Sequence, residues 1–518
     1  MKRIFTLALA LSAITGGAFA QGEMDAFNLS YNDLKGTARS VGMGGAFGAL
    51  GGDVSGIAIN PAGIGVYTKS EVVTSLNFSN AKSTANLTGL SVDEKKFKFD
   101  FDNLAFVGVV SIESDVVPLI NFGFSYNRLK SFDRKVTMNG DFVSRSMTDY
   151  VADVTNRVDN KNGVPPSDLA LGADPFTYSD LWLPAFGYNM GLITPGNANN
   201  NYSSVLDRYS NPTLDNNLYI REKGSIDSYD FNAGTTFADM LSAGITVSVT
   251  DINYHLTSTY NETLFDGKDA NTRIGSYFLD NYLKTEGTGW QVKAGLIFKP
   301  VKELRIGVAY HSPTWYDMTD YYSTVMESDL PDRKVDFIDT YNEVGNTSTD
   351  YKLRTPDKWA FSLAGVIGQY AIISADYELT NYSNMKLKDR DGYEYYDNDY
   401  IKEDFKNSST LRVGAEVRFT PQFSGRIGYM WQESPVDKEV KDGNRTPVTA
   451  GTLTHYSLVG DANYYTWGLG YKFAKNFYTD IAFVIKNRKD DLYSFQGSDK
   501  AELKTSQFSG ILTLGCRF

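Results

Sequence analysis

The residues that could carry out catalysis in this 518-residue chain are few and scattered. Its three histidines, His255, His311 and His455, fall on different predicted strands or loops, and no HExxH, CxxC or paired-histidine metal motif occurs. No Gly-x-Ser-x-Gly nucleophile turn occurs either. His311 and Ser312 are adjacent, which on a strand sends their side chains to opposite faces and argues against a dyad. The sequence therefore predicts no enzyme activity, no metal and no other cofactor.

Carboxylates gather in one predicted loop, residues 389–404. The loop contains Asp389, Asp391, Asp397, Asp399, Glu403 and Asp404. Calcium prefers clustered oxygen ligands, but the regular EF-hand spacing is missing. A solvated acidic loop is the simpler interpretation, and calcium binding stays open as the alternative.

A glycine-rich block near the N-terminus has the composition of a phosphate-binding loop but not its spacing. Ten glycines lie between Gly36 and Gly65. The sixth position counted from Gly42 is Phe47, no strand precedes the block, and no Gly-Lys-Ser/Thr follows, so neither a dinucleotide fingerprint nor a phosphate loop is present. The glycines instead permit close backbone packing and positive φ. Pro61 and Asn60 favour a tight turn at Asn60-Pro61-Ala62-Gly63.

The first twenty residues have the features of a secretory leader. Lys2 and Arg3 precede an apolar run, and Ala18-Phe19-Ala20 is a small-x-small cleavage site, so the mature chain is expected to begin at Gln21. The single cysteine, Cys516, permits no intramolecular disulfide, and no stretch of 18 apolar residues follows the leader. The net charge of −12, which becomes −14 without Lys2 and Arg3, argues against a nucleic-acid partner.

The elements that must position any site are β-strands. Aromatic residues make up 14% of the chain, with 34 Tyr and 31 Phe. Residues 411–419, 304–310 and 512–518 alternate apolar and polar side chains, as expected of a strand with lipid on one face and water on the other. Fourteen such runs are predicted: 70–80, 97–112, 118–136, 226–237, 240–265, 282–299, 303–323, 349–368, 370–387, 407–419, 422–433, 461–473, 476–489 and 503–518. A soluble sandwich or propeller is the alternative, but no repeat of fixed period is present.

The connectors favour an all-β fold, a 14-stranded antiparallel transmembrane β-barrel of the outer membrane. Links after even-numbered strands are short and those after odd-numbered strands are long, the rim pattern of such barrels, which places both termini on the periplasmic side. The last strand ends in Phe518 with apolar residues at alternate positions. It resembles the terminal signal read by the barrel-assembly machinery, an expected partner together with outer-membrane lipid.

The longest connector, about 137–225, is predicted to be an extracellular loop with a short helix over 147–158, where apolar residues recur on one face. An apolar stretch follows it and contains Leu181, Trp182, Leu183 and Phe186. Two interpretations stay open: these side chains form the core of a lid over the barrel mouth, or they capture an apolar ligand.

Several short motifs, in order along the chain, resemble the FadL/TodX-type outer-membrane transporters of long-chain fatty acids and other hydrophobic compounds. The block 38–47 leads to Asn60-Pro61-Ala62-Gly63. The later strands carry four further motifs: Arg305-Ile306-Gly307-Val308-Ala309-Tyr310-His311-Ser312, Thr355-Pro356, Ala375-Asp376-Tyr377-Glu378 with Asn381-Tyr382-Ser383, and Arg426-Ile427-Gly428-Tyr429 before Glu433-Ser434-Pro435-Val436. Tyr382 stands where the family usually has Trp.

The resemblance implies a fourteen-stranded barrel around an N-terminal hatch. The expected organisation is a signal peptide over 1–20, a hatch over 21–68 and the barrel over 69–518. The implied function is passive uptake of a hydrophobic ligand, such as a long-chain fatty acid, with Asn60, Pro61, Ala62 and Gly63 at the gate and exit often lateral, beside a kinked strand. A static plug is the alternative to a gate. A binding or shuttle subunit for secretion or lipid handling is the alternative function, and a polar porin would need an open lumen.

Overall fold

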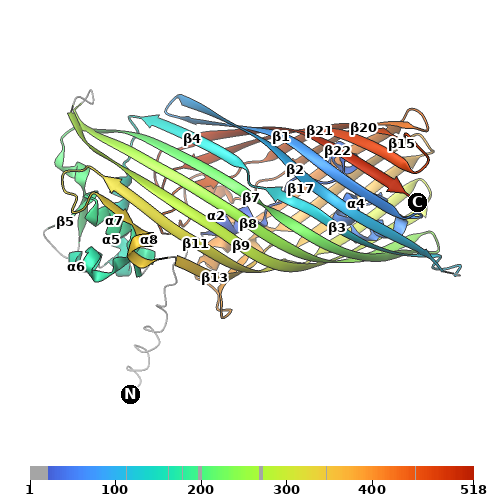
Figure 1. The fold of residues 1–518 in the computed structure, drawn as a ribbon, viewed down its shortest axis with the longest axis horizontal. Helices are drawn as coiled ribbons and strands as arrows, with labels where there is room; N and C mark the ends of the chain where they lie inside the picture. Colours follow the sequence, from blue (N-terminus) through green and yellow to red (C-terminus); the bar gives the residue numbers. More distant parts are fainter. Residues whose placement is uncertain are drawn as a thin grey trace, which may run out of the picture.

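The computed structural model describes residues 22–112, 114–161, 163–177, 179–196, 201–267, 272–345, 347–449 and 451–518, and the expected leader 1–20 lies outside them. The strands form one antiparallel sheet that closes on itself. The last strand pairs with the first, from Glu71 opposite Arg517 to Asn86 opposite Glu502. The predicted 14-stranded antiparallel barrel is confirmed (Figure 1).

Several of the fourteen strands continue beyond a break as a second segment. In chain order they are β1 (Glu71–Leu87), β2 (Leu90–Ser111), β3 (Leu119–Ser131) with β4 (Arg134–Asp141), β7 (Pro212–Phe237), β8 (Leu241–Asp266), β9 (Thr272–Val301), β10 (Leu304–His311) with β11 (Trp315–Ser328), β13 (Thr347–Arg354) with β14 (Lys358–Ile367), β15 (Ala371–Asn381) with β16 (Lys386–Asp389), β17 (Asn407–Arg418), β18 (Phe423–Gln432), β20 (Ala462–Tyr471), β21 (Phe477–Tyr493) and β22 (Ala501–Arg517). Short strands β12 (Phe337–Asp339) and β19 (Tyr456–Leu458) pair with β11 and β21, and β5 (Ile193–Pro195) pairs with β6 (Tyr202–Ser204).

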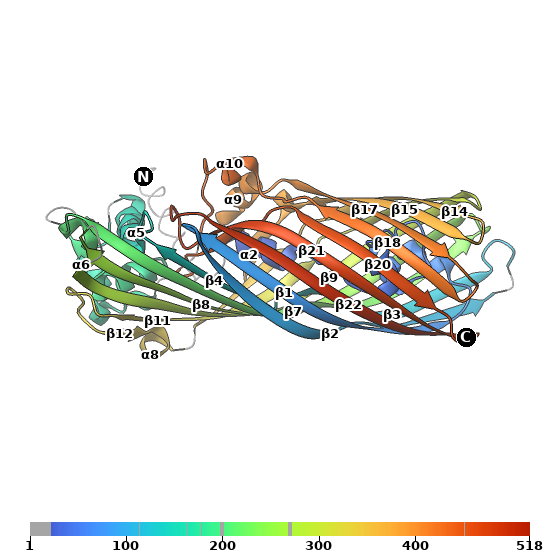
Figure 2. The same cartoon turned by 90° about the horizontal axis from the view of Figure 1, so that it is seen from above.

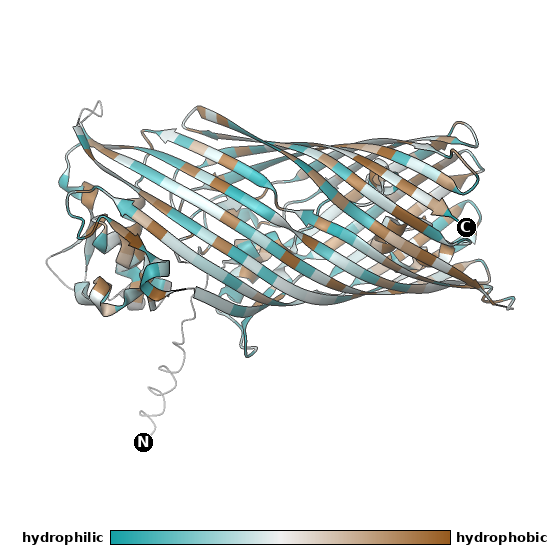
Figure 3. Ribbon diagram, viewed as in Figure 1, coloured by the Kyte–Doolittle hydropathy of each residue, from teal (hydrophilic) through white to brown (hydrophobic). Residues whose placement is uncertain are grey.

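An apolar belt surrounds the end of the barrel that carries the C-terminus (Figure 3). Its side chains point outward from every part of the wall and include Phe78, Phe106, Phe122, Phe231, Val247, Leu296, Phe361, Val413, Trp467 and Phe508. The opposite faces of the same strand segments are polar. Apolar side chains toward lipid and polar side chains toward the lumen are the pattern of a membrane barrel.

Along the long strands, the inward and outward faces exchange polar and apolar character at the upper edge of the belt. On β8, Ile245, Val247 and Val249 are exposed, while Thr246, Ser248 and Thr250 are buried. Beyond this point the outward positions are polar, beginning with Asp251, and the inward positions carry large apolar groups such as Ile252, Tyr254, Leu256 and Tyr260. The barrel therefore continues above the membrane as a water-exposed wall around its own apolar core.

The expected alternation of short and long connectors holds after the even-numbered strands but fails after three odd-numbered ones. β9 begins ten residues earlier than predicted, so the link from β8 to β9 is only residues 267–271, and the link from β21 to β22, residues 494–500, is no longer than that from β2 to β3. The links after even-numbered strands stay short, for example residues 302–303 between β9 and β10. The link after the first strand was expected to be long, and this is wrong, because β1 and β2 run on to a two-residue hairpin turn at Thr88 and Gly89 with φ of 51° and 90°. The strand signal was absent over 81–96 because that part of the hairpin is polar and stands above the apolar belt.

Helices fill the lumen and cover its outer end. The hatch contains α2 (Glu23–Ser30), α3 (Ala38–Gly42), α4 (Val54–Ile59) and the 3-10 turn η1 (Pro61–Val66). The outer end carries α5 (Met147–Lys161), α6 (Pro166–Leu169), α7 (Trp182–Asn189), α8 (Thr340–Val344), α9 (Asp397–Asp404) and α10 (Lys438–Lys441), with 3-10 turns η2 (Leu171–Ala173), η3 (Pro175–Thr177), η4 (Ser179–Leu181), η5 (Val205–Arg208) and η6 (Tyr382–Asn384). Within the described ranges, none of the helices has the length and apolar character needed to span a membrane.

The outer loop is shorter than predicted, although its helix is where the periodicity placed it. The predicted helix over 147–158 is α5. The connector predicted over about 137–225 spans 142–211, because β4 and β7 extend into it. The upper part of β7 escaped prediction since its apolar side chains, such as Leu218 and Ile220, face inward above the belt.

Candidate functional site: hatch, lumen cavity and cap

Side-chain caps fix the local structure of the hatch. The Thr37 side chain accepts a hydrogen bond from the backbone N–H of Ser40 at the start of α3, and Asp53 does the same for Ser55 at the start of α4. The Thr37 hydroxyl also donates to Asp53 Oδ1 at 2.8 Å. Two short helices that are too small to be stable alone are thereby tied to each other.

The turn singled out from the sequence lies against the barrel wall. Asn60 Oδ1 accepts from the Ala62 N–H at 3.1 Å, and Pro61 occupies the first position of η1. Asn60 Nδ2 donates to the Gly48 carbonyl at 2.7 Å and to the Leu296 carbonyl of β9 at 3.2 Å. Asn60 is 1% exposed, so its amide joins the hatch to the wall in a dry environment.

Glycines on the inner wall make room for this turn. Gly234, Gly244 and Gly295 lie opposite one another on β7, β8 and β9. A Cβ on Gly295 would lie 1.9 Å from Asn60 Oδ1, and one on Gly244 would lie 2.2 Å from the Pro61 carbonyl oxygen. The sequence showed these glycines, but their common role requires knowledge of which strands are neighbours.

A second glycine pair receives the backbone at the end of α3. Gly414 of β17 lies opposite Gly428 of β18. A Cβ at Gly414 would lie 2.3 Å from the Met43 carbonyl oxygen, and one at Gly428 would lie 2.2 Å from the backbone nitrogen of Gly44. The hatch backbone thus lies directly on the backbone of the barrel at two separate places.

Polar contacts fasten the hatch around the circumference of the wall. The Arg39 guanidinium of α3 contacts Glu416 of β17 at 2.9 Å, and Glu416 also pairs with Arg426 of β18 at 2.6 Å. Further contacts come from β3, β7, β10, β15 and β22, and they involve Asn121, Thr236, Arg305, Asp376 and Thr513. Each such hydrogen bond stabilises by about 1 kcal/mol net, so together these contacts hold the N-terminal segment against the wall.

A cavity of about 170 Å³ lies in the lumen beside α2. Apolar groups form part of its lining, among them Phe27, Phe132, Leu256 and Leu453. Four cations, Lys130, Arg134, Lys486 and Arg488, line another part together with the carboxylates of Asp25, Asp33, Asp133 and Glu222. Lys486 pairs with Asp33 and Arg488 with Asp490, whereas the Lys130 ammonium donates to Asn28 Oδ1 at 2.8 Å and lies 4.6 Å from the centre of the Phe132 ring. Apolar walls beside a cation that has no carboxylate partner among the described residues suit an amphipathic ligand better than a purely polar solute.

The N-terminal end of α2 reaches the extracellular loops. The Phe27 ring stacks on Phe405 at 5.6 Å, and Glu23 accepts a hydrogen bond from the Val448 N–H at 3.1 Å. Burial, together with the neighbouring carboxyl of Asp404, raises the pKa of Glu23 to about 9, and burial also raises the pKa of Asp404. At neutral pH the two carboxyls therefore share a proton, which joins α2 to α9.

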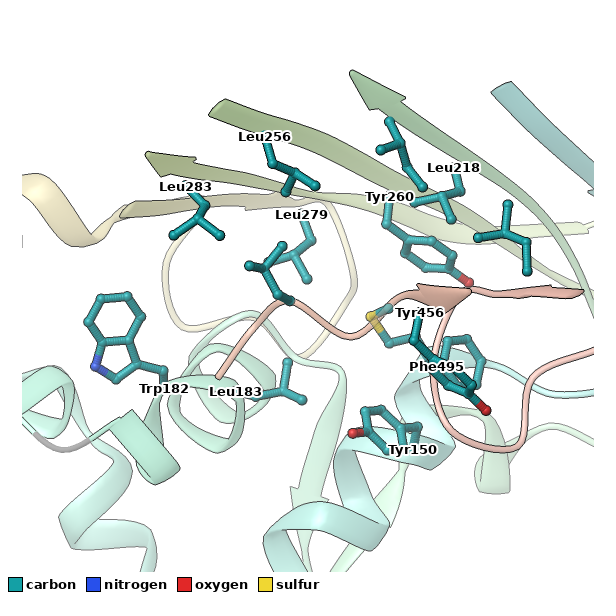
Figure 4. Packing of buried hydrophobic residues seen from close by; sticks show 14 of the residues in the cluster. Tyr150, Trp182, Leu183, Leu218, Leu256, Tyr260, Leu279, Leu283, Tyr456 and Phe495 are labelled. Carbon is teal, nitrogen blue, oxygen red and sulfur yellow. The ribbon is translucent and has the colours of Figure 1, made fainter. Parts of the chain in front are cut away.

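The apolar stretch of the outer loop is buried. Trp182, Leu183 and Phe186 on α7 are 1%, 4% and 0% exposed, and Leu181 packs against the same cluster as a partly buried neighbour. The Trp182 ring stacks on Tyr322 of β11 at 5.4 Å, and its Nε1 donates to the Phe176 carbonyl at 2.8 Å. Figure 4 shows Trp182, Leu183 and Tyr150 beside Leu256, Leu279 and Tyr260 of the wall. These positions form the core of a cap, and their role in ligand capture stays a prediction.

The third strand breaks at the level of the upper edge of the belt. β3 pairs with β2 only from Asn103 opposite Asn127 down to Ser111 opposite Leu119, and β4 pairs with β7. Among the described residues, the upper part of β2, residues 90–102, has its ladder pairing with β1 alone. We call the unpaired line between upper β2 and the β3–β4 strand the seam.

Side chains close the seam. Lys98 forms an ion pair with Asp133 and donates to Ser131 Oγ at 2.6 Å. Thr137 donates to Glu94 Oε1 at 2.8 Å. A small cavity of about 40 Å³ lies on the lumen side and is lined by Lys98, Ser131, Asp133 and Lys486. Opening the seam therefore requires the exchange of side-chain contacts, whereas separating two neighbouring strands inside the belt would break a backbone ladder.

The remaining predicted chemistry lies apart from these features. His255 contacts the Tyr282 hydroxyl at 3.3 Å, His311 contacts the Ile59 carbonyl at 2.9 Å, and His455 lines the lumen cavity. In the loop 389–404, Glu394 pairs with Lys386 at 2.6 Å and Glu403 with Arg445 at 3.3 Å. No cluster of metal-ligating residues occurs in the described part of the chain, so the calcium alternative gains no support.

Comparison with known proteins gives one family and a set of solved structures. The model of the family described as outer membrane protein transport protein (OMPP1/FadL/TodX) matches residues 214–510. The 47 kDa outer membrane protein of Pasteurella multocida (strain Pm70) is 25% identical over 238 residues, covering 44% of this chain and 49% of the relative. The chain thus spans about half the length of the curated relative that it matches.

Two crystal structures have the same fold at low sequence identity. A Pseudomonas aeruginosa FadL homologue is 13% identical with a TM-score of 0.52, covering 94% of this chain and 99% of that chain. The P. putida toluene transporter TodX is 12% identical with a TM-score of 0.51 and the same coverage. These similarities concern transport proteins of the outer membrane and not enzymes, in agreement with the membrane barrel and the transport function expected from the sequence.

Proposed function

Because the chain belongs to the OMPP1/FadL/TodX family of outer membrane transport proteins, we propose that it takes up hydrophobic compounds passively and that long-chain fatty acids are among its ligands. The observation that carries this proposal is the lumen cavity, where apolar walls adjoin Lys130, whose ammonium is bound by Asn28 and by no carboxylate that the structure describes. A fatty acid would place its chain on the apolar side and its carboxylate beside Lys130. TodX is described as a toluene transporter. Toluene has no charge to complement this residue.

The proposed route begins at the cap and ends at the seam. Leu181, Trp182, Leu183 and Phe186 would receive the ligand when the cap opens, since burial of apolar surface is worth about 25 cal/mol per Å². The lumen cavity would hold it next. The hatch turn Asn60-Pro61-Ala62-Gly63 would control the lumen below, and the seam would release the ligand sideways toward the exposed rings of Phe97 and Phe99.

A binding measurement tests the ligand class. In Lys130→Met protein, affinity for a long-chain fatty acid should fall about tenfold, or 1.4 kcal/mol, because a buried cation is lost, whereas affinity for toluene should stay the same. Lys284→Met, at a half-buried position on the outer part of β9 away from the lumen cavity, is the matched control. Equal affinity of wild-type and Lys130→Met protein for the fatty acid would exclude the lumen cavity as its site.

Uptake separates transport from the alternative function. Proteoliposomes with wild-type protein should accumulate the fatty acid without an energy source. Absence of uptake, together with a stable protein partner after gentle solubilisation, would favour the binding or shuttle subunit instead.

A further inference from the structure

A row of lysines crosses the outer face of four neighbouring strands just above the apolar belt. Lys82 of β1 lies opposite Lys95 of β2, and Lys504 of β22 lies opposite Lys489 of β21. β22 also pairs with β1, where Lys504 lies opposite Thr84, so the row is continuous across the closing strand pair. The four strands lie side by side in Figure 2. All four lysines are exposed.

The row lies at a fixed height above the membrane. Phe97 is two residues below Lys95 on β2, and Phe508 is four residues below Lys504 on β22. Both rings face outward, with 67% and 47% exposure. At about 3.3 Å per residue, the ammonium groups stand roughly 7–13 Å along the strands from the last lipid-facing rings, the depth of lipid headgroups.

A groove opens at one end of this row. It has a volume of about 750 Å³ and is lined by the cations Lys441 of α10, Arg488, Lys489 and Lys504, by the carboxylates Asp461 and Asp491, and by the polar side chains of Asn463, Asn487 and Ser506. It forms where the chain turns through Gly460, whose backbone N–H donates to Asp490 Oδ1 at 3.0 Å, and then enters β20 at Ala462. The groove therefore combines cations with hydrogen-bonding groups suited to sugar hydroxyls and phosphate oxygens.

Neighbouring carboxylates leave part of this positive charge unbalanced. Lys82 pairs with Asp93 at 2.8 Å, while Lys489 and Lys504 share Glu502. Asp461 is engaged by the Ser434 N–H at 2.8 Å and by Trp431 Nε1 at 3.3 Å, and Asp491 pairs with Lys500 at 3.5 Å. Lys441 and Lys95 form no ion pair with any residue that the structure describes.

We propose that this groove and lysine row bind the phosphate-bearing headgroup of an outer-leaflet glycolipid. The headgroup phosphate would contact Lys489 and Lys504, and Lys441 would close over it. The acyl chains would run down the outer wall over Phe508. Exposed ion pairs contribute little free energy individually. Lys489 and Lys504 can therefore give up Glu502 and bind a phosphate oxygen at little cost in free energy. This site is on the outer wall and does not depend on the ligand that the lumen accepts.

Lipid binding by the delipidated, detergent-solubilised full-length barrel tests the proposal. Bisphosphorylated lipid A should bind the wild-type protein about tenfold more tightly than Lys489→Gln/Lys504→Gln protein, because two charge-assisted contacts are lost. The matched control, Lys223→Gln/Lys284→Gln, removes two lysines from β7 and β9 and should bind lipid A like the wild type. Heat-modified migration on gels verifies that each barrel is folded.

The same titration identifies the chemistry that is recognised. Lipid A stripped of phosphate should lose the same tenfold in affinity, and inorganic phosphate alone should compete only weakly. Equal binding by both double variants, or equal binding of dephosphorylated lipid A, would overturn the proposal. Full competition by inorganic phosphate would show an anion site without lipid recognition and would also overturn it. Fatty acid uptake should be unchanged in Lys489→Gln/Lys504→Gln protein, which keeps this result separate from that for the lumen.

Discussion

At the scale of single residues, the contact between Glu23 and Asp404 depends on one proton. Glu23 is 1% exposed and lies on α2, whereas Asp404 belongs to an extracellular helix far along the chain. Two ionised carboxylates buried side by side would repel each other strongly, because little water is present to screen their charges. A group whose pKa is raised on folding contributes stability that is complete below its ordinary pKa and is lost as the pH rises through the folded value. For Glu23 that window runs from 4.5 to about 9.

The N-terminal helix is therefore expected to loosen in alkaline solution. Hydrogen exchange of residues 22–31, corrected for its intrinsic pH dependence, should accelerate as the pH rises from 7 to about 10. Glu23→Gln removes the titrating group and should make the exchange rate independent of pH over this window. Asp404→Asn should reduce the pH response without abolishing it, because burial still raises the pKa of Glu23 after the repulsion is removed. An unchanged pH response in both variants would assign it to another group.

At the scale of elements, the hatch packs closely against the wall because glycines on the wall have no side chains there. Gly244 and Gly295 are neighbours on β8 and β9, and together they admit the backbone of the turn at Asn60. A methyl group at either position would need the space that the turn occupies. Overpacking of this kind typically costs about 1–3 kcal/mol, and here it is the hatch that can move.

Gly295→Ala should displace the hatch without unfolding the barrel. We expect a several-fold higher single-channel conductance in planar bilayers than for the wild type, because the turn at Asn60 leaves the wall. The matched control is Gly365→Ala on β14, where an added Cβ meets no atom within 4 Å, and its conductance should equal that of the wild type. A closed channel in Gly295→Ala protein would show that the hatch is sealed by contacts elsewhere.

The sequence predicted elements well where membrane physics imposes a simple rule. Inside the belt, outward apolar and inward polar residues alternate, and all fourteen strands were found there. Above the belt this rule reverses, so Leu218 and Ile220 of β7 were assigned to a loop. Contacts such as Glu23 with Asp404 could not be predicted, because nothing in the local sequence joins residues so far apart. Glycines on the inward face of adjacent strands were the available signal for the hatch-binding surface.

At the scale of the whole molecule, the seam gives the barrel a weak side. Inside the membrane belt every neighbouring strand pair, β2 and β3 included, is joined by a backbone ladder. Just above the belt, the ladder between upper β2 and the third strand is missing. The seam has side-chain contacts in its place, including Thr137 to Glu94 at 2.8 Å. Replacing a few side-chain contacts costs a few kcal/mol, whereas breaking a ladder would cost one backbone bond after another.

Joining the two sides of the seam should stop transport. In a Cys516→Ser background, Glu94→Cys/Thr137→Cys protein treated with a short bifunctional thiol reagent should lose fatty acid uptake, while the untreated protein keeps it. The control, Thr84→Cys/Asp93→Cys, links two residues that already lie opposite each other in the β1–β2 hairpin and should transport normally after the same treatment. Normal uptake through the linked seam would exclude lateral exit at this place.

The exchange of polar and apolar faces along β8 also limits how the strands of this barrel can change in length. Val249 faces outward and Ile252, three residues later, faces inward, so the sequence of β8 determines where along the strand the membrane surface lies. If the barrel moved two residues deeper into the membrane, Asp251 would enter the hydrocarbon. If it moved two residues outward, Val249 would be exposed to water. Insertion of a single residue would turn every side chain beyond it to the other face. Lineages that lengthen or shorten this wall therefore need steps of two residues made together on the paired strands, or a bulge that absorbs the extra residue, as Asp102 does between β2 and β1.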